Sequence, residues 1–116
     1  MKELFQEILT IENVYGAIYV SAEGKVLFSQ TTSDSGKELE AVDWPSLFAA
    51  FGDAKEVTMV YDYRRIYVRR AHNGYVLVLM GLVVPVSMVR LSCDALLPTL
   101  EKQGASKGLM RFFRRK

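Results

Sequence analysis

Residues 16–29 read GAIYVSAEGKVLFS, and this stretch decides the fold class. The run from Val14 to Ala22 is rich in Val, Ile and Tyr, which are enriched in β-strands. Ala22-Glu23-Gly24 interrupts it, and Gly24 can take the positive φ that a tight turn requires. Residues 25–30 then alternate between apolar and polar types, as a returning strand does. The stretch therefore predicts a β-hairpin.

Helical patterns lie at both ends of the chain. Residues 3–12 predict a short helix, because their apolar side chains recur at helical spacing and acidic residues suit the start of a helix. Residues 86–103 keep an apolar helical stripe, although Pro98 is expected to kink this helix or end it nearby. Residues 104–108 (GASKG) predict a flexible linker. The chain then ends in a short basic, aromatic segment.

A third helix is predicted in the middle of the chain, after a polar surface loop over residues 31–40. Asp43 is a typical N-cap residue, and Pro45 suits the first turn because its missing N–H has no partner there anyway. Gly52 is placed to end this helix.

Three further strands are expected. Val57 to Tyr63 is apolar and β-branched, and Arg65 to His72 alternates. Asn73-Gly74 predicts the hairpin turn that follows. Tyr75 to Gly81 is apolar on both faces, so it needs cover on both sides, either from two helices on one face and one on the other or from a partner chain. The order α-β-β-α-β-β-β-α predicts an α+β fold with a five-stranded antiparallel sheet flanked by helices.

Length and composition favour one globular domain. The chain has 116 residues, of which 50% are hydrophobic, and this apolar content excludes intrinsic disorder for most of it. One cysteine excludes an intramolecular disulfide framework and a multi-cysteine metal site, and is compatible with a cytoplasmic location. We expect a folded domain over residues 1–103 and a flexible basic tail over residues 104–116.

The net charge of +2 conceals an uneven distribution. Residues 102–116 hold six Lys and Arg and no acidic residue, whereas residues 1–101 hold nine basic and thirteen acidic residues. A nucleic-acid-binding body is disfavoured, because phosphate neutralisation requires a basic face on the fold. The N-terminal segment lacks the apolar run of a signal peptide, and the longest apolar stretch, residues 75–88, is too short to span a bilayer.

Sequence signatures of common catalytic sites are missing. The chain has no phosphate-binding loop, dinucleotide fingerprint, nucleophile elbow or zinc-protease motif. Cys93 lies on the apolar stripe of a predicted helix, where burial is the expected role. His72 is expected to be an exposed residue at a hairpin end, with a pH sensor or ligand as the alternative. We therefore expect no enzyme activity, no catalytic or metal-binding residues and no cofactor.

Three groups of residues remain as candidates for binding. Arg64, Arg65, Arg69 and Arg70 form either a solvated strand face or a contact for an acidic partner or a phosphate; an arginine finger for a nucleotide-hydrolysing partner is a further alternative. The middle helix is rich in apolar residues, which form either core or an interface: Trp44, Leu47, Phe48 and Phe51. The tail either solubilises the chain or contacts an acidic partner or, weakly, an anionic membrane, and its contact residues would be Arg111, Phe112, Phe113, Arg114 and Arg115.

The element order and several segments resemble the roadblock (dynein light chain) family. The resemblance rests on the opening helix, on residues 16–21 (GAIYVS) and 23–26 (EGKV), and on residues 75–80 (YVLVLM) and 86–91 (VSMVRL). It covers roughly residues 1–103. Profilin-like, longin and GAF-type domains share parts of this architecture.

The resemblance implies a homodimer in which the third strand and the middle helix pair with their copies. The interface would then contain the residues Trp44, Leu47, Phe48, Phe51, Val57, Met59, Tyr61 and Tyr63. Bacterial members of the family are often associated with small Ras-like GTPases. The leading hypothesis is therefore a cytoplasmic, non-enzymatic, dimeric module that binds or modulates such a GTPase or a signalling or motility complex. The alternative is a profilin-like small-ligand sensor with a pocket lined by Tyr and Arg between the sheet and a helix.

Overall fold

The computed structural model describes residues 2–31, 42–61 and 63–114, and beyond residue 100 it describes the backbone alone. The elements in chain order are η1 (Lys2–Phe5), α1 (Gln6–Leu9), β1 (Val14–Ser21), β2 (Val26–Thr31), α3 (Trp44–Phe51), β3 (Glu56–Tyr61), β4 (Arg64–Ala71), β5 (Gly74–Gly81) and α4 (Val86–Arg114). Five antiparallel strands form one sheet in the order β2-β1-β5-β4-β3. The predicted α+β fold is confirmed, whereas most of the predicted polar loop lies outside the described residues.

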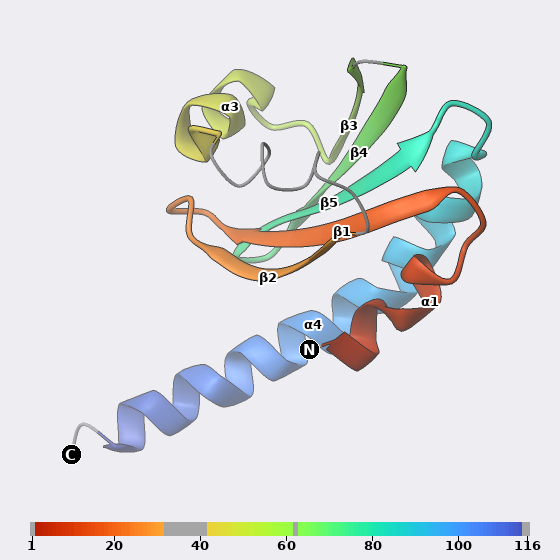
Figure 1. The fold of residues 1–116 in the computed structure, drawn as a ribbon. Helices are drawn as coiled ribbons and strands as arrows, with labels where there is room; N and C mark the ends of the chain where they lie inside the picture. The colour runs from red at the N-terminus through yellow and green to blue at the C-terminus, as the bar shows by residue number, and fades with distance from the viewer. Residues whose placement is uncertain (1, 32–41, 62, 115–116) are drawn as a thin grey trace.

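Helices cover both faces of the sheet, as the apolar sequence of β5 requires. Figure 1 shows α1 and α4 on one face and α3 on the other. Every residue of β5 is buried. The two sides of the sheet accordingly carry separate cores, one under α1 and α4 and one under α3.

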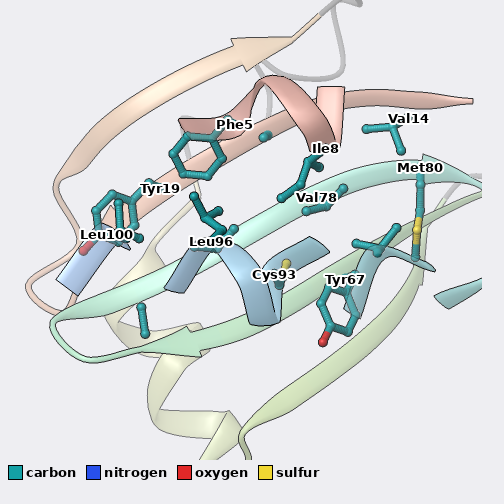
Figure 2. Packing of buried hydrophobic residues seen from close by; sticks show 14 of the residues in the cluster. Phe5, Ile8, Val14, Tyr19, Tyr67, Val78, Met80, Cys93, Leu96 and Leu100 are labelled. Atoms are coloured by element: carbon teal, nitrogen blue, oxygen red, sulfur yellow. The ribbon is translucent and has the colours of Figure 1, made fainter. Parts of the chain in front are cut away.

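The core beneath α1 and α4 joins residues from both ends of the chain (Figure 2). Phe5, Tyr67 and Cys93 are all fully buried there. The ring of Phe5 also stacks on Phe28 of β2, with ring centroids 4.7 Å apart. The expected burial of Cys93 is confirmed.

The core beneath α3 is aromatic. Trp44 and Phe48 are buried, and the Phe48 ring stacks on Tyr75 of β5 with ring centroids 3.8 Å apart. The predicted caps of this helix are confirmed. Asp43 accepts hydrogen bonds from the backbone N–H and the hydroxyl of Ser46, and Gly52 ends the helix with a φ of 60°.

The hairpin between β4 and β5 differs by one residue from the prediction. The two turn residues are His72, which is exposed as expected, and Asn73, while Gly74 opens β5 opposite Ala71. A glycine is needed at position 74 because the backbone of β1 lies close to it, and not because of the turn. An added Cβ would lie 2.2 Å from the carbonyl oxygen of Val20.

The terminal helices also depart from the prediction. The first one is shorter than residues 3–12 and divides into η1 and α1. The last one is longer, because α4 continues past Pro98 and through residues 104–108, which were expected to be a flexible linker. Proline leaves the carbonyl four residues earlier without its helical partner. That carbonyl belongs to Asp94, an exposed residue where water can replace the partner.

Candidate interaction surface

Strand β3 forms an exposed edge of the sheet. It pairs with β4 through six consecutive residue pairs without a bulge, from Glu56 opposite Arg69 to Tyr61 opposite Arg64. Within the described residues, no strand lies on its other side. Its sequence, EVTMVY, contains no proline and no basic residue, the features that usually discourage edge pairing. This edge can therefore accept another strand.

The opposite edge of the sheet is less suited to pairing. The ladder between β1 and β2 has a register shift between Tyr19 and Val20, and Lys25 lies directly before β2. Bulges and lysines are both devices that natural sheets use against edge-to-edge association. Of the two edges, β3 is the better candidate for an interface.

Apolar side chains border the β3 edge on both faces of the sheet. On the α3 face, four of the predicted interface residues are half-buried at the margin of the core: Leu47, Phe51, Val57 and Met59. On the α4 face, Val60 is 70% exposed, and Tyr63 in the turn after β3 is 86% exposed. Trp44 and Phe48 are buried in the core beneath α3, and the half-buried residues of this surface pack against that core. The side chain of Tyr61 lies outside the described residues.

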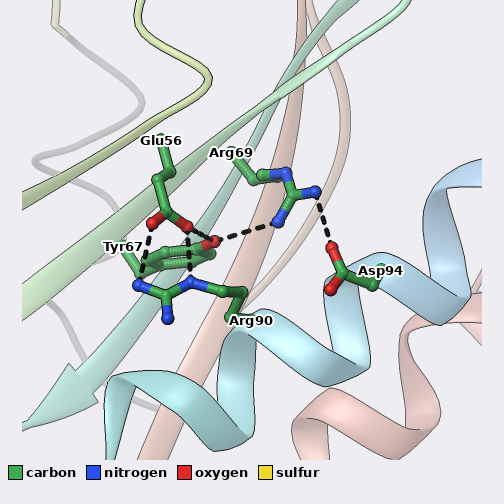
Figure 3. A network of polar contacts seen from close by, with 5 residues as sticks. All are labelled: Glu56, Tyr67, Arg69, Arg90 and Asp94. Carbon is green, nitrogen blue, oxygen red and sulfur yellow. Dashed lines mark hydrogen bonds and ion pairs between the residues drawn. The ribbon is translucent and has the colours of Figure 1, made fainter.

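A polar network ties the β3 edge to α4 (Figure 3). The Glu56 carboxylate of β3 accepts hydrogen bonds from Arg90 Nε at 2.9 Å and from the Tyr67 hydroxyl. A second Arg90 nitrogen lies 2.8 Å from the other carboxylate oxygen, so this pair is bidentate. Arg69 donates to the Tyr67 hydroxyl at 3.3 Å and pairs with Asp94 of α4 at 2.6 Å.

The network shifts the proton affinity of its members. Hydrogen bonds from Arg90 and then from Tyr67 lower the pKa of Glu56 below its usual value. Burial, followed by the hydrogen bond to Glu56, raises the pKa of Tyr67 to about 12. At neutral pH the pair is therefore a carboxylate and a neutral phenol, which is the combination that the observed hydrogen bond needs.

The pleat of β4 separates the four predicted binding arginines onto two faces of the sheet. On the α4 face, Arg65 donates to the carbonyl oxygens of Leu82 and Val84, and Arg69 belongs to the polar network. On the α3 face, Arg64 lies over the Tyr15 ring, 5.5 Å from its centroid. Arg70 is exposed, and its ion pair with the fully exposed Asp53 is long, at 3.9 Å. Arg70 is thus the most accessible of the four.

Other candidate groups are placed apart from this surface. The structure puts Cys93 in the core, and burial raises the pKa of its thiol to about 12. Over the described ranges, no three His, Cys, Asp or Glu residues gather closely enough to hold a metal ion. In the tail, residues 111–114 belong to α4, and Arg115 lies outside the described residues.

Sequence reasoning missed two features of this surface. Val60 was not singled out, although Val60 and Glu56 alternate with Val57 and Met59 and so lie on the opposite face of the strand. The contact between Glu56 and Arg90 had no local signal, because 34 residues separate them in the sequence.

The fold of this chain is found in solved structures, two of which are described next, whereas no protein-family model and no curated protein matches the chain. One is the Roadblock/LC7 domain from Streptomyces avermitilis, with 18% sequence identity and a TM-score of 0.65 over 89% of this chain and 92% of that one. The other is MglB with a tetrameric arrangement, with 15% identity and a TM-score of 0.65 over 87% of this chain and 85% of that one. The chain therefore has the roadblock/LC7 fold that the sequence resemblance predicted.

Proposed function

We propose that this chain is a non-enzymatic, cytoplasmic interaction module. It forms a homodimer and binds or modulates a small Ras-like GTPase or an associated signalling or motility complex. The observation that carries the proposal is the β3 edge, beside which no strand lies among the described residues, together with its apolar border. Self-association is supported further by the roadblock fold and by the tetrameric arrangement of MglB. The GTPase partner follows from the family resemblance.

In the proposed dimer, β3 of each copy pairs along its free edge, and the sheet continues into the partner. Val57 and Met59 would complete their burial against the copy of α3, with Leu47 and Phe51 beside them. Burying exposed apolar surface such as Val60 favours association by roughly 25 cal/mol per Å². Arg70 is the arginine that we propose for the contact with an acidic partner.

The alternative of a small-ligand sensor is less well supported. A depression of about 400 Å³ lies beside Val83 and Met88, and a second one of about 260 Å³ lies between α1 and α4. Neither of these two is lined by Tyr or Arg, as the predicted sensor pocket would be.

The dimer is tested by replacing Val60 with Lys, which puts a charge on the free edge. Val83, 77% exposed in the turn before α4, gives a matched control in Val83→Lys. Sedimentation equilibrium should show a dimer for the wild-type chain and for Val83→Lys, and a monomer for Val60→Lys. Both substitutions should change the stability of the subunit itself by no more than about 0.5 kcal/mol. A wild-type chain that stays monomeric at high micromolar concentration would disprove the dimer.

The partner is tested by affinity capture from the cytoplasm of the source organism, followed by titration of the purified candidate. Recovery of a small GTPase that binds the wild-type chain is the expected result, with weaker binding for Arg70→Glu. If capture recovers no GTPase, the partner assignment fails while the dimer remains open to its own test.

A further inference from the structure

A groove follows the junction between α4 and the N-terminal segment that contains η1 and α1, which lies beside α4 in Figure 1. Two depressions mark this α1–α4 groove. Residues 10–13 meet residues 83–88 at the first, and residues 3–8 meet residues 92–99 at the second, so the two segments run antiparallel along it. The depressions have volumes of about 400 and 260 Å³. At about 1.5 Å per residue, residues 88–99 of α4 extend roughly 16 Å, or three helical turns.

The wall of the groove that α4 and the preceding turn supply is apolar. Val83 is 77% exposed and Met88 is 49% exposed, and both line the first depression. Over the described part of the chain, no helix is long and apolar enough to cross a membrane. At the second depression α4 presents the small residues Ser92 and Ala95, which let another helix approach closely. An apolar groove of this length suits the apolar face of an amphipathic helix.

The opposite wall of the groove is negatively charged. Glu12 lines the first depression and Glu3 and Glu7 line the second, and no other described lining residue carries a charge. All three are exposed, and none takes part in an ion pair between described side chains. Arg90, the basic residue in the part of α4 before residue 101, is paired with Glu56 of β3 instead. A complementary ligand therefore carries Lys or Arg beside its apolar residues.

We propose that the α1–α4 groove binds a basic amphipathic helix of a partner protein. Its apolar side chains contact Val83, Met88 and Ala95, and its Lys and Arg side chains lie beside the three glutamates. Because α1 packs on β1 whereas β3 forms the far edge of the sheet, the groove is separate from the edge proposed for the dimer. It also lies on the opposite face of the sheet from Arg70. The dimer and the helix site can therefore be tested independently.

The proposal is tested by fluorescence anisotropy with two labelled synthetic peptides of about 15 residues. Both carry leucines at the same helical spacing, and the remaining positions are Lys in one peptide and Glu in the other. Glu3→Gln/Glu7→Gln removes two carboxylates from the groove, and Ala95→Lys fills it with a long, positively charged side chain. The matched control, Glu23→Gln/Asp53→Asn, removes two exposed carboxylates elsewhere. The fluorescence of the single tryptophan verifies that every variant is folded.

The wild-type chain and the control should bind the Lys peptide with a Kd on the order of 10 µM and the Glu peptide at least about tenfold more weakly. Affinity for the Lys peptide should fall roughly fivefold in Glu3→Gln/Glu7→Gln. It should fall about tenfold or more in Ala95→Lys. Equal binding of the two peptides, or unchanged affinity in Ala95→Lys, would overturn the proposal. Displacement of the Lys peptide by an equal concentration of a peptide of residues 102–116 would also overturn it, because the groove would then belong to the basic end of a second copy.

Discussion

Replacing Tyr67 with Phe removes one oxygen atom and keeps the ring that fills the core beneath α4. The hydroxyl donates to Glu56 at 2.5 Å and accepts from Arg69 at 3.3 Å. A hydrogen bond with a charged partner contributes roughly 1.5–3 kcal/mol. Glu56 retains both contacts from Arg90, and its side chain is 34% exposed, so water can take the vacated position. We therefore expect the free energy of unfolding to fall by about 1–2 kcal/mol at pH 7.

The same substitution should change how stability depends on alkaline pH. The pKa of Tyr67 is raised from 10.0 to about 12 in the folded chain, chiefly by burial. A raised pKa means that its stabilising effect is fully present below pH 10 and is lost as the pH rises from 10 to 12. Because phenylalanine does not titrate, the advantage of the wild-type chain over Tyr67→Phe should shrink across this interval.

Urea unfolding at one fixed protein concentration measures both effects. The single tryptophan, Trp44, reports on unfolding from the opposite face of the sheet, so the substitution leaves the probe untouched. Tyr63→Phe is the matched control, because Tyr63 is 86% exposed and should lose almost nothing. An unchanged midpoint for Tyr67→Phe, or a difference that stays constant between pH 10 and 12, would refute the role assigned to the network.

Two further predictions concern the core. Gly74→Ala should lower the free energy of unfolding by about 2 kcal/mol or more, because its Cβ would lie 2.2 Å from the carbonyl oxygen of Val20; an unchanged melting temperature would contradict this close approach. Cys93 should react with Ellman's reagent roughly a hundredfold more slowly in the folded chain than in urea, because burial raises the pKa of its thiol to about 12; equal rates would show that the site is open to solvent.

Most of the fold could be predicted because the signals that define its elements are local. Three signals can each be read from a few neighbouring residues. They are the alternation around Gly24, the helix cap at Asp43 and the run of apolar residues that becomes β5. The prediction was less accurate where distant contacts compete with local preference. Gly74, predicted as a turn residue, is needed for the approach to β1. The end of the last helix was also placed too early, because two glycines at residues 104 and 108 suggested a linker where α4 continues.

The candidate surface was predictable only in part. The apolar composition of the middle helix and the third strand indicated α3 and β3 as the elements of a candidate interface. The structure shows that these apolar residues differ in burial. Trp44 and Phe48 are buried in the core, whereas Leu47 and Phe51 are half-buried at its margin. A side chain at helical spacing is apolar in either role, so the sequence pattern could not separate the two.

The sequence by itself determined the fold class, the order of its elements and the concentration of positive charge in residues 102–116. These properties follow from hydrophobic periodicity, turn residues and charge counts, all of which are local. The structure also shows that α4 continues to Arg114. Only the tertiary structure decided that, among the described residues, no strand lies on the outer side of β3, and that Glu56 meets Arg90. Those outcomes depend on strand order, register and the packing of distant segments, and no short stretch of sequence specifies them alone.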